Sequence, residues 1–164
     1  MTTLRKRTLA LAIASLLLLV GCNPQAPEAS APAQSAVNGQ TDAVATIGDV
    51  TVRSSVIQTS MLPEEVARQY GVERSPKTLL LLVASRKGDA AVATSLPATV
   101  GATVTDLRGG VQDIAIRQVQ ADSFTDYVGT LTTTLPDTLR FDVTVRIDGI
   151  APVHLRFQRE LYPQ

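Results

Sequence analysis

Residues 139–148 read LRFDVTVRID, in which every odd-numbered position as far as Ile147 is apolar and every even-numbered position is polar. Because successive side chains of a strand point to opposite faces, this alternation predicts a β-strand that is buried on one face. Asp148-Gly149 follows, a pair typical of tight turns, and residues 153–157 alternate in the same way. The two segments are therefore predicted to form an antiparallel hairpin.

Strand-like patterns also cover the middle of the chain. Residues 98–104 alternate, and β-branched and aromatic residues are spread over 111–120 and 123–135. Residues 79–83 read LLLLV, which predicts a central strand covered on both sides, with a short buried helix as the alternative. About eight strands in this length favour an all-β fold, an antiparallel two-layer sandwich of the immunoglobulin-like kind, with an open barrel as the alternative.

One segment departs from the strand pattern. Residues 60–71 read SMLPEEVARQYG, in which the proline suits a first helical turn, the glutamates suit the positive end of the helix dipole and the glycine suits a C-terminal cap. A short helix is predicted near 63–70. Val66 and Tyr70 are four residues apart and share a helical face, which we expect to pack against one end of the sandwich.

The N-terminal residues 1–21 have the layout of a secretory signal peptide. Three basic residues at positions 5–7 precede an apolar run over 9–20, which is shorter than the roughly 20 residues that a membrane-spanning helix needs. Residues 19–22 read LVGC and resemble the bacterial lipobox. The resemblance implies cleavage before Cys22, a diacylglyceryl thioether on its sulfur and acylation of its new amino group.

Cys22 is the only cysteine, so a disulfide within the chain is excluded. A buried core thiol or a catalytic nucleophile would need a packed domain around it, which neither flank supplies. Residues 22–45 comprise the lipidated cysteine and a stretch rich in Ala, Pro, Ser and Gln, which predicts a disordered tether. The remaining segment, 46–164, is long enough for one β-sandwich domain without disulfides.

The charges argue against nucleic acid as a partner. The chain has 15 basic and 15 acidic residues, and loss of the signal peptide leaves the mature protein slightly acidic with no basic patch. Asn23 follows the lipidated cysteine, which by analogy with enterobacterial sorting favours the outer membrane. The expected location is the cell envelope of a Gram-negative bacterium, anchored in the outer membrane and facing the periplasm.

Three stretches of the domain carry a family resemblance. The run LPEEVARQYGVERS at 62–75, the apolar strand at 79–83 and LRFQRELY at 155–162 resemble the uncharacterised proteobacterial DUF4426 family. The resemblance covers essentially the whole globular part. It implies an exported β-rich domain and assigns no catalytic residue.

No constellation of residues points to catalysis, a metal or a cofactor. His154 is the only histidine and lies on the polar face of a predicted strand, and no G-x-S-x-G motif is present. One histidine with scattered carboxylates lacks the spacing of a metal site. We therefore expect no enzyme, no metal and no cofactor, with a small periplasmic enzyme using His154 as the less favoured alternative.

The sequence favours a lipid-anchored, non-enzymatic domain that binds another envelope component, with a protein as the favoured partner. The alternative is a receptor for a small hydrophobic or glycan ligand held between the sheets. Candidate partner-binding residues are Tyr70, Arg74 and Ser75, which follow the predicted helix. The competing interpretation is structural, with Tyr70 anchoring the helix to the core and Arg74 holding the exit loop.

Overall fold

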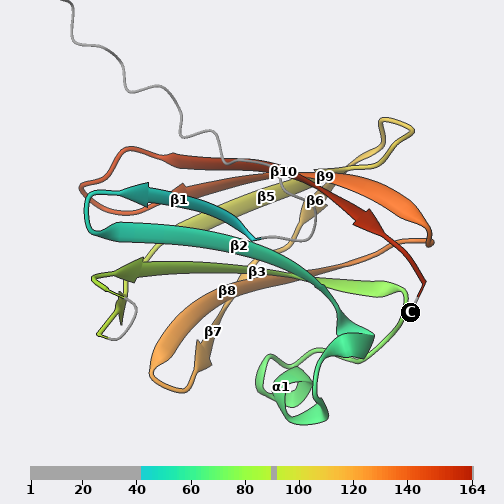
Figure 1. Cartoon of the computed structure of the whole chain (residues 1–164), viewed down its shortest axis with the longest axis horizontal. Helices are drawn as coiled ribbons and strands as arrows, with labels where there is room; N and C mark the ends of the chain where they lie inside the picture. Colours follow the sequence, from blue (N-terminus) through green and yellow to red (C-terminus); the bar gives the residue numbers. More distant parts are fainter. Residues whose placement is uncertain (1–41, 90–91, 164) are drawn as a thin grey trace, which may run out of the picture. The chain divides into compact units, whose positions relative to one another are not determined.

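The computed structural model describes residues 42–89 and 92–163, which form two antiparallel β-sheets packed face to face (Figure 1). Sheet A has the order β1-β2-β3-β8-β7, with β4 paired to β3, and sheet B has the order β10-β9-β5-β6. The predicted all-β sandwich is confirmed, although the described residues form ten strands instead of about eight.

The strands and helices have the following bounds. Sheet A contains β1 (Ala43–Ile47), β2 (Val50–Gln58), β3 (Thr78–Lys87), β4 (Thr94–Ser95), β7 (Arg117–Ala121) and β8 (Phe124–Thr132). Sheet B contains β5 (Thr99–Thr105), β6 (Val111–Ile114), β9 (Asp137–Arg146) and β10 (Val153–Leu161). A short 3-10 helix, η1 (Thr59–Met61), and the α-helix α1 (Glu64–Gln69) lie between β2 and β3.

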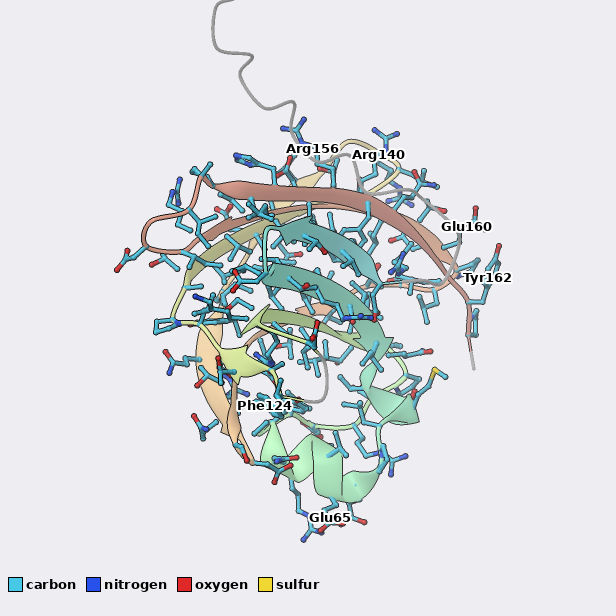
Figure 2. All side chains as sticks on the ribbon, turned by 60° about the vertical axis from the view of Figure 1, so that its left-hand side comes forward. Glu65, Phe124, Arg140, Arg156, Glu160 and Tyr162 are labelled. Carbon is cyan, nitrogen blue, oxygen red and sulfur yellow. The ribbon has the colours of Figure 1, made fainter. Side chains whose placement is uncertain are left out.

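The predicted hairpin is confirmed as β9 and β10. Phe141 and Phe157 face each other across the pair, with ring centroids 5.1 Å apart and an angle of 12° between the ring planes. Both rings are buried in the core between the two sheets, together with the other apolar side chains of the inner faces. The polar positions of the same strands point away from the core, as Figure 2 shows for Arg140 and Arg156.

The LLLLV segment lies in β3, at the centre of sheet A. Leu79, Leu81 and Val83 face the core between the sheets, and Leu80 belongs to a second apolar cluster on the outer face of sheet A. The prediction of a central strand covered on both sides is therefore confirmed.

Helix α1 covers the second apolar cluster on that outer face. Leu62 and Ala67 pack with Leu80 of β3 and Val128 of β8, so the short helix gains its stability from tertiary packing.

The C-terminus of α1 ends in the predicted glycine cap. Gly71 has a φ of 59°, and its nitrogen donates to the Arg68 carbonyl at 3.0 Å. The nitrogen of Val72 donates to the Ala67 carbonyl at 2.9 Å. These are the two hydrogen bonds of a Schellman motif, which requires a left-handed residue where glycine stands.

The segment 111–120 is divided between the two sheets. β6 pairs with β5 in sheet B, whereas β7 pairs with β8 in sheet A, and the chain crosses between the sheets at Ala115 and Ile116. This crossing packs so closely on β8 that a Cβ atom on Gly129 would lie 2.5 Å from Cγ2 of Ile114.

β1 starts at Ala43, so the folded domain begins before residue 46, its predicted start. The predicted signal peptide, Cys22 and the tether up to residue 41 lie outside the described residues.

Candidate functional site

A buried carboxylate links α1 to sheet A. The Tyr70 hydroxyl donates a hydrogen bond of 2.8 Å to Asp126 on the outer face of β8, and Arg86 of β3 forms an ion pair with the other oxygen of that carboxylate. Arg86 also donates to the Thr125 carbonyl at 2.9 Å, and its guanidinium lies 4.6 Å from the centroid of the Phe124 ring. Asp126 is 5% exposed, so its charge is compensated by partners instead of water.

The network fixes the protonation state of Tyr70. Burial and the hydrogen bond to Asp126 raise the pKa of Tyr70 to about 12. The phenol therefore stays protonated and donates a hydrogen bond to the carboxylate. In this geometry the bond holds the end of α1 on the sheet.

Arg74 and Ser75 lie apart from this network and contact η1. Arg74 donates to the Ser60 carbonyl at 2.8 Å, and the nitrogen of Ser75 donates to the Thr59 hydroxyl at 2.9 Å. The structure therefore does not bring Tyr70, Arg74 and Ser75 together as one patch. That these residues bind a partner stays a prediction.

His154 lies on the exposed outer face of sheet B. Its Nδ1 is 3.1 Å from the hydroxyl of Thr144, the residue opposite it on β9. This contact joins two polar side chains on the outer face of the sheet.

The feature of the structure that is most suited to binding is a free strand edge in sheet A. β8 runs from Phe124 to Thr132, but β7 pairs with it only from Phe124 to Val128. Among residues 42–89 and 92–163, the strand register gives the stretch from Gly129 to Thr132 no partner on that side. A strand with one unpaired edge can accept a further strand.

The backbone polarity of this edge follows from the pairing of β8 with β3. The nitrogen of Thr133 donates to the Lys77 carbonyl of the β3 side at 3.0 Å. Backbone groups alternate in direction along a strand, so Leu131 also faces β3, whereas the N–H and C=O groups of Thr130 and Thr132 face the free edge. Thr130 and Thr132 thus present donors and acceptors that no strand of the described residues pairs with.

Two pockets flank the free edge on opposite faces of sheet A. The pocket on the outer face has a volume of about 300 Å³ and lies between the loop after α1, the start of β7 and β8; it is lined by Gly71, Val72, Glu73, Thr78, Ala115, Arg117, Val128, Gly129 and Thr130. The pocket on the inner face has a volume of about 250 Å³ and reaches the core side chains Val104, Leu131 and Leu139. Alternate side chains of an added strand would point into one pocket and then the other.

A larger groove of about 640 Å³ continues from the inner pocket along the end of the sandwich. It lies between the β5–β6 turn and the β8–β9 loop, and both hollows share Asp106, Thr132, Thr133 and Asp137. Leu107 lines the groove and Val111 lines the inner pocket, and their side chains are strongly exposed. The free edge therefore opens into a continuous, partly apolar surface.

Sequence patterns did not reveal this edge. Segment 111–120 indicates strand structure throughout, without a Gly or Pro where the chain changes sheets. Gly71, Val72 and Glu73, which line the outer pocket, lie between the predicted candidates Tyr70 and Arg74.

Two further observations concern the described part of the chain only. There, no three His, Cys, Asp or Glu side chains gather closely enough to hold a metal ion. Within the same residues, no helix has the length and apolar character required to cross a membrane.

Comparisons with known proteins show relatives of this domain. A family model described as "Domain of unknown function (DUF4426)" matches residues 44–164. The crystal structure of a DUF4426 family protein from Pseudomonas aeruginosa PAO1 is similar with a TM-score of 0.63 and 24% identity, covering 75% of this chain and 96% of that one. No curated protein matches the chain.

Two structures of FetP from uropathogenic Escherichia coli are also similar. One is a copper-bound variant and the other was isolated after expression in the periplasm of E. coli; both have a TM-score of 0.53 and 10% identity. The alignments cover 74% of this chain and 95% and 93% of the FetP chains. At this level of identity the likeness shows a shared fold.

Proposed function

This chain belongs to the DUF4426 family, and from that premise we propose that its domain is a non-enzymatic module of the cell envelope that binds an extended segment of a partner protein. The observation that carries the proposal is the free edge of β8 from Gly129 to Thr132, with a pocket on each face of the sheet. Strand addition gains affinity from main-chain hydrogen bonds and specificity from pockets that accept alternate side chains.

The geometry of the edge limits the segment that it accepts. Only Thr130 and Thr132 direct backbone groups outward, so the added strand is short, and its side chains decide the choice of partner. The inner pocket reaches Leu131 and Leu139, so it suits an apolar side chain of the added strand. The outer pocket contains Glu73 and Arg117, which suits a polar one.

We also propose that the domain acts at the membrane surface through acylated Cys22, with the outer membrane as its site. The LVGC sequence and the basic and apolar segments before it support this anchor. Two or three acyl chains make release from a bilayer negligible. FetP, expressed in the periplasm, shares the fold, which agrees with an envelope location.

The binding proposal is tested by photo-crosslinking in intact cells. The photoreactive amino acid p-benzoylphenylalanine at position 130 is expected to trap one partner segment, which mass spectrometry then identifies. The same amino acid at position 144, on the outer face of sheet B, is the matched control and is expected to trap little.

Two variants of the last residue of β8 separate backbone pairing from side-chain contact. Thr132→Pro removes the N–H directed at the free edge without removing a bond to β3, and proline is tolerated on strand edges. Thr132→Ala keeps that N–H. Crosslinking from position 130 should be lost in the Pro variant and kept in the Ala variant, and equal yields in the two variants would refute strand addition at this edge.

A further inference from the structure

A separate pocket of about 390 Å³ lies on the outer face of sheet A, at the end opposite to the free edge of β8. Its walls come from β2, β3 and the start of β8, and it is lined by Thr51, Arg53, Ala84, Arg86, Gly88, Ala93 and Phe124. The volume is at the lower end of the range of small-molecule sites, which is roughly 300–1,000 Å³.

The pocket exists because a small residue stands on its floor. Along the outer face of β3, Ala84 lies between the large side chains of Leu82 and Arg86, and it is directly opposite Arg53 of β2. A larger side chain at Ala84 would fill the space between the two arginines.

Arg86 presents a fixed guanidinium to this pocket. Three contacts fix its position: an ion pair with Asp126, a hydrogen bond to the Thr125 carbonyl and stacking on Phe124. Asp126 is in turn held by Tyr70. A cation that is positioned before binding loses little side-chain entropy when a ligand arrives.

Arg53 supplies a second cation on the neighbouring strand. It pairs with Asp42 at 2.8 Å, and its side chain is 53% exposed. Neither Asp42 nor Asp126 lines the pocket, so the lining contains two arginines and no carboxylate. Each guanidinium has five N–H donors, so the donors that the pairs with Asp42 and Asp126 leave unused can bind an anion in the pocket.

Phe124 provides the apolar wall. It is one of the exposed large hydrophobic residues, with 37% of its surface accessible, and Figure 2 shows it well apart from Tyr162. Ala84 and Ala93 extend this wall. A planar or aliphatic body can therefore pack here while its charged group reaches the arginines.

We propose that this pocket binds a small carboxylate with an apolar body, whose carboxylate pairs with Arg53 and Arg86 while its body packs on Phe124 and Ala84. The site lies on a different part of sheet A from the free edge of β8, so the proposal goes beyond partner binding and does not depend on it. Fatty acids and aromatic acids share this chemistry.

The first test uses the chain from residue 22 onward with Cys22→Ala, so that neither the apolar segment of the predicted signal peptide nor an acyl chain competes for the probe. The anionic dye 8-anilinonaphthalene-1-sulfonate is expected to bind with a rise in fluorescence and to raise the thermal unfolding midpoint, as a ligand of the folded state does. The neutral dye N-phenyl-1-naphthylamine has the same rings and no sulfonate, and it should bind more weakly. Equal binding of the two dyes would overturn the proposal.

Octanoate and benzoate then compete with the bound dye. Displacement by octanoate alone identifies an aliphatic acid as the preferred class, and displacement by benzoate alone identifies an aromatic one. Displacement by both shows that the pocket takes either class, whereas displacement by neither contradicts a carboxylate site.

Three variants locate the site. Arg53→Ala should weaken dye binding roughly tenfold, which corresponds to one lost charge-assisted hydrogen bond. Ala84→Leu should abolish binding by filling the floor. Arg156→Ala is the matched control, because Arg156 is also an exposed strand residue paired with an aspartate, at 2.7 Å on sheet B.

The control should bind the dye as the parent protein does. If Arg53→Ala and Arg156→Ala have the same affinity for the dye, the proposal is wrong. The conclusion does not depend on Ala84→Leu folding correctly, because Arg53 is exposed and its removal leaves the core intact.

Discussion

The hydroxyl of Tyr70, at the end of α1, donates a 2.8 Å hydrogen bond to Asp126, which lies 56 residues further along the chain on β8. This contact joins a short helix to the middle of sheet A through a carboxylate that is almost inaccessible to water. Arg86 holds the same carboxylate from β3. The three side chains thus connect the helix to two neighbouring strands, and the position of α1 depends on them as well as on apolar packing.

Tyr70→Phe is expected to lower the free energy of unfolding by about 1.5–3 kcal/mol, since it removes a hydrogen bond to a buried charge while keeping the ring. Urea unfolding measures the change. Tyr162→Phe is the matched control, because the Tyr162 hydroxyl donates to Glu160 at 3.1 Å on the exposed surface. The control should unfold as the wild-type protein does, and equal effects of the two changes would contradict a stabilising role for the bond to Asp126.

The same bond predicts a pH dependence. The pKa of Tyr70 is raised from 10.0 to about 12, first by burial and then by Asp126. A group whose pKa is raised on folding contributes stability that is complete below its unfolded pKa and is lost as the pH passes its folded pKa. The difference in unfolding free energy between wild type and Tyr70→Phe should therefore shrink between pH 10 and pH 12. A constant difference over that window would show that Tyr70 ionises as an exposed phenol does.

Gly129→Ala should destabilise the domain by about 1–3 kcal/mol, because the added methyl group overpacks the crossing between the sheets. The new Cβ would lie 2.5 Å from Cγ2 of Ile114 and 2.9 Å from the carbonyl oxygen of Ala115. Gly101→Ala is the control within another strand, since its Cβ would meet no atom within 4 Å. Thermal unfolding should separate the two variants. An unchanged midpoint for Gly129→Ala would mean that the chain segment between the sheets shifts to accommodate the methyl group at little cost in free energy.

Sequence patterns predicted the parts of the fold whose structure is determined by residues close together in the chain. The alternation around Phe141 and Phe157 fixes which side of each strand is buried, and the structure pairs these two residues directly. Gly71 at the end of the predicted helix is likewise sufficient to indicate the cap that is observed.

The proposed binding surface could not be predicted in this way because it arises from pairing between distant strands. The free edge exists only because β7 begins at Arg117, opposite Val128, while β8 continues to Thr132, a difference in length that no single segment encodes. Asp126 is similar: it is one polar residue on the outer face of a strand, and only the fold brings Tyr70 and Arg86 to it.

Cys22→Ala should abolish acylation without changing the fold of the domain, because Cys22 precedes the first residue of the described structure by a long stretch of chain. Metabolic labelling with palmitate measures the effect. Circular dichroism of the variant should match that of the parent. Labelling that persists in the Ala variant would show that the lipobox interpretation is wrong.

Arg74→Ala distinguishes the predicted polar patch from the free edge as the site of partner binding. The Arg74 guanidinium is exposed and donates to the Ser60 carbonyl at 2.8 Å, so its removal should lower the free energy of unfolding by no more than about 0.5–1.5 kcal/mol. Because the backbone groups of Thr130 and Thr132 are untouched, crosslinking from position 130 should keep its full yield. A variant that keeps its urea midpoint but loses the crosslink would instead place recognition on Arg74 and its neighbours, and the free edge of β8 would no longer be needed to explain binding. Arg74→Lys adds a check, since a retained crosslink in that variant alone would identify the positive charge as the group that the partner recognises.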